Sequence, residues 1–377
     1  MAGIYIHIPF CKQACHYCDF HFSTSLKKKE EMMVALKKEL FLRKDELTHE
    51  PIETIYFGGG TPSILSVEEI NSLLDCVYQW YRVSEKPEIT LEANPDDLDH
   101  ATIHRLAQSK VNRLSIGIQS FGEEDLKMMN RAHNAQEALL CLQEAVLYFD
   151  NISVDLIYGI PNLSDERWVE NIQRVLDLGI PHISCYALTV EERTALNKLI
   201  QKGLVPSPKE EVAHAHFMLL IEKLKQNGYV HYELSNFAKP GYYSKNNSAY
   251  WLGKKYLGIG PSAHSFDGKY RSWNIANNPL YIKAIEAGTL PSEIEELSLS
   301  DRYNEYIMTG LRTIWGVDID RVQKEFGTAY LDYLLKGSAS LIADGFMQKQ
   351  DHILTITDKG KFLSDGIASD LFWLDLK

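Results

Sequence analysis

The chain has 377 residues, 45% of them apolar, and a formal net charge of −12. Because this length exceeds that of one compact domain of ordinary size, we expect one large and one small domain. The acidic balance argues against nucleic-acid binding, which requires a basic surface. The chain shows neither a secretory signal pattern nor an apolar run of about 18 residues, so we expect a cytoplasmic protein.

Six short β-like runs alternate with helical patterns in the first half of the chain. The runs lie at 4–8, 54–57, 88–92, 113–119, 153–159 and 182–188. Alternation of this kind is typical of βα units on a parallel sheet. Since six units are fewer than the eight of a closed barrel, the pattern predicts an α/β fold with an incomplete, laterally open (β/α)6 TIM-like barrel. Such barrels carry their chemistry on the loops at the C-terminal ends of the strands.

Composition divides the chain into three regions. Residues 1–230 form the expected partial barrel. Residues 231–297 are rich in Gly, Asn and aromatic residues and lack periodicity, so we expect an irregular segment that wraps the barrel. Residues 298–377 show short helical patterns, two short strands and a closing helix, which resembles a winged-helix-like domain. Acidic residues outnumber basic ones there, which favours a lid, docking or structural role over DNA binding.

Three cysteines lie on the loop that follows the first expected strand. Cys11, Cys15 and Cys18 have the spacing CxxxCxxC. Three thiolates can hold three irons of a 4Fe-4S cluster and leave the fourth iron open for a substrate. S-adenosylmethionine (SAM) suits that open iron, because its amino and carboxylate groups can chelate the metal while the sulfonium accepts an electron. Exposed cluster thiolates also favour a reducing compartment.

A zinc site is the alternative interpretation of the same loop. His16, Asp19 or His21 would then be the fourth ligand. Structural zinc usually takes paired CxxC or Cys/His elements, and no second pair occurs in this sequence. The cysteine pattern therefore favours the cluster over zinc.

A glycine-rich turn, GGGTP, follows the second expected strand at residues 58–62. Alone, such a sequence is more often just a turn. Together with the cysteine loop it becomes specific, because loops that follow neighbouring parallel strands lie at the same end of a barrel. CKQACHYC followed by GGGTP resembles the radical SAM superfamily. HIPFC, LEANPDD, LSIGIQSF, LKMMNRAH, VDLIYGIP, YELSNFA and GIGPSAHS are similar to the group that contains oxygen-independent coproporphyrinogen III oxidase and the HemW-type haem chaperones.

The resemblance implies SAM contacts near the first two strands. Tyr17 is similar to the aromatic residue that packs on the SAM adenine. Tyr5 would lie on the side of the first strand that faces SAM and the cluster. Gly59, Gly60 and Thr61 would line the methionine part of SAM.

The resemblance also implies contacts from later strands. Glu92 ends the third strand as a carboxylate where an apolar residue is the ordinary choice, which favours ligand contact over a salt bridge. Gln119 and Asp155 end the fourth and fifth strands, and Asp155 would accept hydrogen bonds from ribose hydroxyls. Arg131 is similar to an arginine that binds a ligand carboxylate through its planar fork.

Two features separate the oxidase from the chaperones. The pattern typical of the oxidase is CxxxCxxCxC, with a fourth cysteine two residues after the third. This chain has Phe20 at that position. The oxidase also carries an N-terminal extension, whereas ten residues precede Cys11. The chain is therefore expected to be a haem chaperone that binds haem and passes it to apoproteins. The alternative is an enzyme acting on a tetrapyrrole, either an oxygen-independent coproporphyrinogen III dehydrogenase or a haem-opening methyltransferase, so whether the chain is an enzyme stays open.

The haem ligand is not identified by the sequence. HemW-type chaperones usually show an HNxxYW-like motif, and its histidine position is Asn246 here. Asparagine is a poor iron ligand compared with imidazole. His231 and His264 lie in the same region and are more often structural than ligating. The family further implies a flavodoxin-type or ferredoxin-type reductant and a recipient haem apoprotein, and no motif decides between a monomer and a homodimer.

Overall fold

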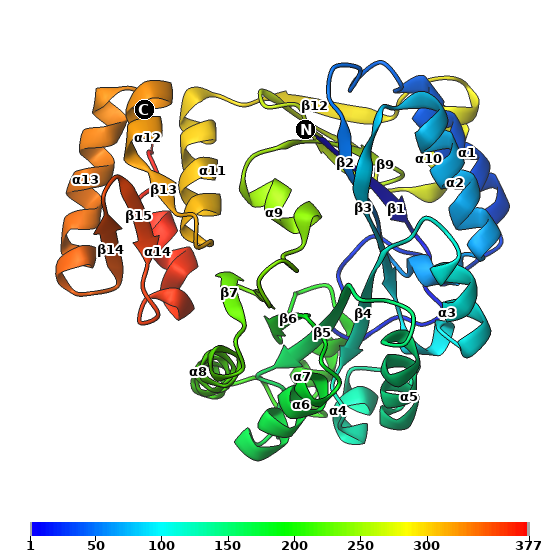
Figure 1. Cartoon of the computed structure of the whole chain (residues 1–377), viewed down its shortest axis with the longest axis horizontal. Helices are drawn as coiled ribbons and strands as arrows, with labels where there is room; N and C mark the ends of the chain where they lie inside the picture. Colours follow the sequence, from blue (N-terminus) through cyan, green and yellow to red (C-terminus); the bar gives the residue numbers. More distant parts are fainter. Residues whose placement is uncertain (1, 375–377) are drawn as a thin grey trace.

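The structure is a computed structural model that describes residues 2–374. Twelve strands form one large sheet (Figure 1). The first six strands lie side by side in chain order, and each runs parallel to the next. Their bounds are β1 (Ala2–Ile8), β2 (Ile52–Gly59), β3 (Val83–Ala93), β4 (Arg113–Gln119), β5 (Ile152–Tyr158) and β6 (His182–Ala187). These strands confirm the α/β fold class and the six-unit partial barrel.

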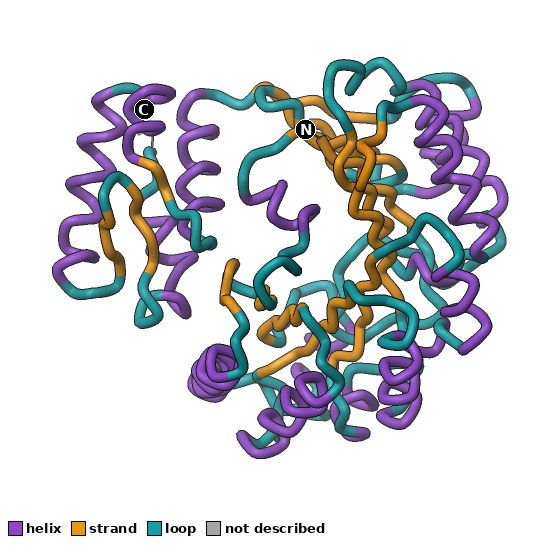
Figure 2. The backbone as a smooth tube through the Cα atoms, in the orientation of Figure 1, coloured by secondary structure: helices purple, strands orange, loops and turns teal. Residues whose placement is uncertain are grey.

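Helices follow the strands and cover mainly one face of the sheet (Figures 1 and 2). They are α1 (Lys29–Leu42), α2 (Val67–Trp80), α3 (His100–Ala107), α4 (Glu123–Met128), α5 (Ala135–Ala145), α6 (Asp165–Asp177), α7 (Ala195–Gln201) and α8 (Glu210–Gln226). Short 3-10 turns occur at Pro62–Ile64 and Pro95–Asp97. Apolar side chains of the strands and of these helices form the main buried core. Burial of this core supplies most of the free energy that holds the barrel together.

The region expected to be irregular instead contains strands and two helices. They are β7 (Val230–Glu233), β8 (Asn236–Ala238), α9 (Lys245–Trp251), β9 (Lys255–Ile259), β10 (His264–Phe266), β11 (Tyr270–Asn274), α10 (Asn278–Glu286) and β12 (Ser292–Glu296). The β7–β8 hairpin extends the sheet beyond β6, while β9 pairs parallel with β1 and begins the extension at the other edge. Strands of three to five residues are too short to show alternation in the sequence, and they form here because they pair with the open edges of the barrel sheet.

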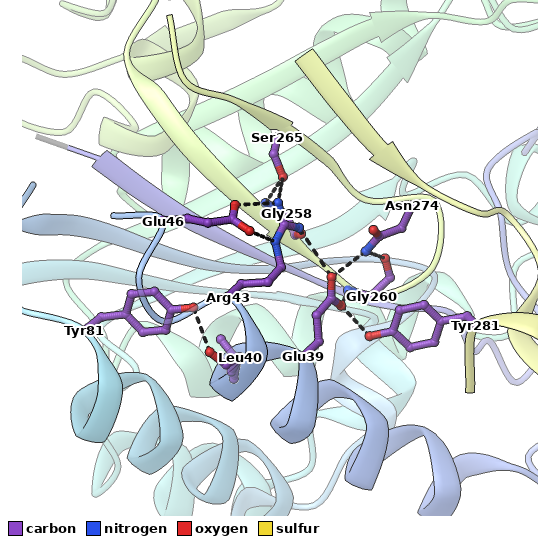
Figure 3. A network of polar contacts seen from close by, with 10 residues as sticks. All are labelled: Glu39, Leu40, Arg43, Glu46, Tyr81, Gly258, Gly260, Ser265, Asn274 and Tyr281. Carbon is purple, nitrogen blue, oxygen red and sulfur yellow. Dashed lines mark hydrogen bonds and ion pairs between the residues drawn. The ribbon is translucent and has the colours of Figure 1, made fainter. Parts of the chain in front are cut away.

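A buried carboxylate joins α1 to the strands β9–β12 that extend the sheet beyond β1, here called the added strands (Figure 3). Glu39 accepts hydrogen bonds from the backbone nitrogen of Gly260 (2.8 Å), from Asn274 Nδ2 (2.7 Å) and from the hydroxyl of Tyr281. Burial raises the pKa of Glu39, and the neighbouring Arg43 opposes this rise. Because its partners come from three separate segments, Glu39 fixes the added strands against the helix.

The guanidinium of Arg43 extends the same network (Figure 3). It donates to the carbonyl oxygen of Gly258 (2.9 Å), to Ser265 Oγ (3.2 Å) and to both carboxylate oxygens of Glu46 (2.8 Å each). Ser265 Oγ also accepts a hydrogen bond from the backbone nitrogen of Gly258 (2.9 Å). These bonds fix β10 beside β9.

The C-terminal part has its own small sheet and its own hydrophobic core. Its elements are α11 (Leu299–Leu311), β13 (Val317–Asp318), α12 (Ile319–Phe326), α13 (Thr328–Ala343), β14 (Met347–Gln350), β15 (Ile353–Ile356) and α14 (Ser364–Asp370), with a 3-10 turn at Lys361–Leu363. The antiparallel strands lie in the order β13-β15-β14, which gives the winged-helix-like arrangement. Residues 375–377 of the expected domain lie outside the described part of the chain, and the boundaries at 230 and 297 stay predictions.

Figure 1 shows α9 between the large sheet and α11. Contacts of α9 with β1, β2 and α11 place it as the bridge between the barrel and the C-terminal module. Within residues 2–374, no helix is both long enough and apolar enough to cross a membrane.

Candidate functional site

The C-terminal ends of the parallel strands surround a pocket of about 420 Å³. Every residue predicted from the sequence lines this pocket except Tyr5. The predicted lining residues are Cys11, Cys15, Cys18, Tyr17, Gly59, Gly60, Thr61, Glu92, Gln119, Arg131 and Asp155. Tyr5 lies deeper in the barrel, where its hydroxyl is 3.2 Å from His7 Nδ1 and its ring stacks 6.1 Å from that of Tyr56.

Backbone hydrogen bonds tie the cysteine loop to the glycine turn. The nitrogen of Gly60 donates to the carbonyl oxygen of Ile8 (2.9 Å), and the nitrogen of Thr61 donates to that of Phe10 (2.7 Å). A side chain at Gly60 would collide with the backbone of Phe10, and one at Gly59, whose φ is +108°, would collide with the ring of His7. Only glycine therefore permits this close approach of the two loops.

The thiols of the cysteine loop are buried to different degrees. Cys11 is buried, whereas Cys15 and Cys18 are partly exposed. Burial raises the pKa of Cys11 and of Cys18 to about 11. Both thiols therefore carry their protons in the metal-free protein, and metal binding must release those protons.

The histidines considered for a zinc site do not line the pocket. His16 Nδ1 lies 2.8 Å from the carbonyl oxygen of Met128, and His21 Nε2 lies 2.7 Å from Asn278 Oδ1. Asp19 and the three cysteines remain as pocket-lining donors on this loop. Three thiolates beside an open pocket suit a 4Fe-4S cluster with one iron left for a ligand.

Arg131 places a cation beside the cysteine loop. Its Nη1 atom lies 3.2 Å from Cys15 Sγ, while Nη2 donates to Asn94 Oδ1 and to the carbonyl oxygen of Gly117, both at 2.7 Å. The buried Nε atom has no hydrogen-bond partner within the described chain. A fixed guanidinium with a free N–H group is suited to bind an anionic group such as a carboxylate.

Two carboxylates lie deeper in the pocket. Tyr56 donates a hydrogen bond of 2.7 Å to Glu92 Oε1, and burial raises the pKa of Glu92 to about 7. Burial likewise raises the pKa of Asp155 to about 6, and Arg113 opposes both shifts. Arg113 is itself buried, and its Nε atom lacks a partner in residues 2–374. The two carboxylates form a floor of the pocket that can accept hydrogen bonds from a polar ligand, and the charge of Arg113 lies close to both of them.

Gln119 ends β4 in an unusual backbone conformation. Its φ is +67°, a region that non-glycine residues rarely occupy. A side chain at Gly117 would collide with the Gln119 amide and crowd the Arg131 guanidinium. This backbone conformation directs the Gln119 amide into the pocket, and the absence of a side chain at Gly117 leaves room for the amide there.

Sequence reasoning missed Asn94, Arg113 and Gly117. Gly117 lies inside a strand, and an isolated glycine in a strand is a signal of close approach by another group. Asn94 directly follows the third strand, at the edge where functional side chains gather. Arg113 gave no comparable signal, because it lies at the start of β4, and only the pairing of β3 with β4 brings it near Glu92.

Asn246 lies away from this pocket. Its side chain is 4% exposed and accepts a hydrogen bond of 3.1 Å from Thr54 Oγ1. Its backbone nitrogen donates to Glu88 (3.0 Å), and a side chain at Gly3 would also contact it. Position 246 is thus packed between α9 and the barrel strands.

Comparisons with known proteins agree with the fold and the domain organisation. A family model described as the radical SAM superfamily matches residues 5–175, and one described as the HemN C-terminal domain matches residues 297–363. The solved structure of coproporphyrinogen III oxidase (HemN) from Escherichia coli superposes with a TM-score of 0.85, covering 98% of this chain and 90% of that chain. At 23% identity, this likeness shows the fold.

Full-length relatives are more similar in sequence. The chain is 33% identical to the heme chaperone HemW of Bacillus subtilis (strain 168), with 97% of this chain and 98% of that protein covered. It is 31% identical to the heme chaperone HemW of Mycobacterium tuberculosis (strain ATCC 25618 / H37Rv), with 98% and 94% covered. Identity at this level across both domains exceeds what a shared fold requires. The chain therefore belongs to the HemW family within the radical SAM superfamily.

Proposed function

We propose that this protein is a haem chaperone of the radical SAM type, which binds haem and transfers it to apoproteins. Its similarity to HemW proteins over nearly the whole chain carries this proposal. Phe20, two residues after Cys18, supports it further, since the oxidase pattern has a cysteine there. The recipient apoprotein is the partner of the transfer step.

The cysteine loop would hold a 4Fe-4S cluster through Cys11, Cys15 and Cys18. When bound, such a cluster supplies the single electron that cleaves SAM. Arg131 would bind the carboxylate of SAM through its unpaired Nε–H group while Nη1 stays near Cys15 Sγ. Tyr17, whose hydroxyl is 3.5 Å from Arg131 Nη1, would cover the SAM adenine.

The remaining pocket residues would position the rest of SAM. Gly59, Gly60 and Thr61 would line its methionine part, because the glycines allow a ligand to approach the backbone. Asp155 would accept hydrogen bonds from the ribose hydroxyls.

Three further groups would complete the SAM site. Gln119 would donate its amide to the ligand from the end of β4. Glu92, held by Tyr56, would accept a hydrogen bond from the SAM amino group. Tyr5 would support this floor from below through its stacking on Tyr56.

A catalytic role on a tetrapyrrole is the second candidate. The fold likeness to coproporphyrinogen III oxidase covers 98% of this chain, so the chain shares its fold with an enzyme. Cysteines without disulfides and a partly exposed thiol loop suit a reducing cytoplasm, where a flavodoxin or ferredoxin would deliver the electron.

Anaerobic reconstitution with iron and sulfide followed by haem titration tests the proposal. We expect an absorbance shoulder that bleaches with dithionite, stoichiometric haem uptake, and transfer of haem to a haem-free b-type haem protein. Incubation with SAM, reductant and coproporphyrinogen III provides the contrasting assay. Conversion to protoporphyrinogen would overturn the chaperone assignment, and zinc filling the loop in place of iron would overturn the radical SAM assignment.

A further inference from the structure

A protein ligand to the haem iron would strengthen haem binding, and position 246 does not provide one. Asn246 is buried, and its side-chain oxygen is hydrogen-bonded to Thr54. We propose that His264 on β10 is the protein ligand of the haem iron and that the haem ring lies on the face of β10 and β11 formed by His264, Phe266, Arg271 and Trp273. This inference rests on the proposed haem-binding function and adds the site at which haem binds.

Most of the other histidines use one ring nitrogen in a hydrogen bond, and the rest lie elsewhere in the chain. Those with a ring nitrogen in a hydrogen bond are His7, His16, His21, His100, His104, His133, His182, His216 and His231. His214 lies on α8 with its ring against Phe362, and His49 and His352 lie in turns. Among the described residues, His264 is thus the histidine on the large sheet whose ring makes no hydrogen bond.

The direction of the His264 side chain follows from its neighbour. Ser265 points toward α1, where its hydroxyl accepts a hydrogen bond from Arg43 (3.2 Å). Side chains alternate along a strand, so His264 and Phe266 point to the opposite face, away from α1. A side chain at Gly258 would collide with the carbonyl of His264, so glycine at 258 allows β10 to cross this close to β9.

This face continues the inner surface of the barrel. Tyr256 on β9 pairs with Gly3 on β1, and Gly258 pairs with Tyr5, so Tyr256 and Tyr5 face the same side. The ring of Tyr256 packs edge-on against Tyr250 of α9 at 4.6 Å. His264 is therefore separated from Tyr5, which lies below the SAM pocket, by a single intervening strand.

Aromatic side chains share this face with His264. Trp273 on β11 pairs with His264, and the two rings lie 6.0 Å apart with planes tilted by 33°. Phe266 lies 6.2 Å from the ring of Tyr256, measured between centroids. A flat aromatic ligand gains both burial and stacking on such a surface, as a porphyrin ring would.

The charge on this face also suits an iron ligand. Burial lowers the pKa of His264, and the nearby Arg271 lowers it further. The imidazole is therefore neutral near neutral pH and can offer a lone pair to iron. Arg271 pairs with Glu305, so the face presents its rings and one imidazole rather than a strong net charge, and the haem propionates would stay in solvent.

Spectroscopic titration of the cluster-loaded protein with haem tests the proposal. Wild-type protein, His264→Ala and the control His352→Ala would be titrated with ferric haem, and difference and EPR spectra would report the axial ligand. We expect His264→Ala to lose the imidazole-ligated signal and to bind haem about tenfold more weakly. Added imidazole would restore that signal. Trp273→Leu would weaken binding while keeping the signal.

The outcomes separate this inference from the proposed function. Wild-type binding together with an unchanged signal in His264→Ala would overturn the ligand assignment and leave the chaperone proposal standing. Absence of haem binding by the wild-type protein would overturn both. Thermal unfolding of each variant shows whether it folds, and the imidazole rescue separates loss of the ligand from loss of structure.

Discussion

Arg131 Nη1 lies 3.2 Å from Cys15 Sγ, and this contact joins the loop before α5 to the cysteine loop across the pocket. The same guanidinium also bonds Asn94 and the carbonyl of Gly117, so one side chain links three segments around the pocket. The pocket is thus formed by the protein alone. A preformed site reduces the ordering that a ligand must impose when it binds.

Replacing Arg131 by lysine keeps the charge and removes the planar fork. We expect Arg131→Lys to bind iron and sulfide normally but to bind SAM about tenfold more weakly, because an ammonium group cannot make the same set of bonds. Equilibrium binding of SAM to the cluster-loaded protein measures this. Arg105→Lys, at an exposed pair with Glu68, is the matched control. Unchanged SAM affinity in Arg131→Lys would contradict the assigned role.

Replacing Cys15 by alanine removes one of the three proposed cluster ligands. We expect Cys15→Ala to lose the 4Fe-4S absorbance yet unfold cooperatively, because the core is formed by other strands and helices. Cys76→Ala changes a partly buried cysteine on α2 and should keep full iron content. Iron analysis and thermal unfolding test both variants. A Cys15→Ala protein with wild-type iron would show that the loop is not the cluster site.

Glu92 makes the stability of the SAM-free protein depend on pH. Its pKa rises from 4.5 to about 7 on folding, so the folded state binds its proton more tightly than the unfolded chain does. The resulting stability is present below pH 4.5 and is lost as pH rises through 7. Glu92→Gln lacks this loss. The free energy of unfolding of Glu92→Gln minus that of wild type should therefore rise by on the order of 3 kcal/mol when the pH is raised from 5 to 8.

Urea unfolding at several pH values measures the effect of Glu92→Gln. Glu124→Gln, an exposed change on α4, serves as the control and should follow the wild-type curve. If the difference between Glu92→Gln and wild type were the same at pH 5 and pH 8, the raised pKa of Glu92 would be refuted.

Tyr281 tests the network between α1 and the added strands. Tyr281→Phe keeps the ring and removes the hydroxyl that donates to buried Glu39. We expect a loss of about 2 kcal/mol in the free energy of unfolding, because the carboxylate loses a donor without access to water. Tyr78→Phe, at a partly exposed ring, should change stability by less than about 0.5 kcal/mol. Chemical denaturation compares the two, and equal effects would argue against the network.

Arg312 links the barrel to the C-terminal module. Its Nη2 atom lies 3.5 Å from buried Glu233 on β7, and Nη1 pairs with Asp365 on α14. Arg312→Met leaves Glu233 without its cation, so we expect a loss of about 2 kcal/mol and faster hydrogen exchange in α14. Arg321→Met breaks an exposed pair with Glu325 and should cost less than about 0.5 kcal/mol. Exchange in α14 that does not respond to Arg312→Met would exclude this coupling.

The sequence predicted the elements whose patterns are local. The six parallel strands could be predicted because each carries apolar and β-branched residues within a short run, and the cysteine and glycine loops could be predicted because their spacing is short. The same local reasoning missed β9–β12, because strands of three to five residues carry too little pattern. These strands exist because the edges of the barrel sheet need partners.

The sequence by itself predicted the kind of chemistry, since three cysteines in CxxxCxxC spacing favour a 4Fe-4S cluster over zinc and the glycine turn strengthens that interpretation. The tertiary structure alone decided which distant residues join that loop. It brought Arg131 close to Cys15. It also placed His264 on β10, with only β9 between this strand and the strand of Tyr5, and it buried Asn246. Contacts between residues more than a hundred positions apart depend on the order of the strands in the sheet and on packing, and short-range sequence patterns determine neither.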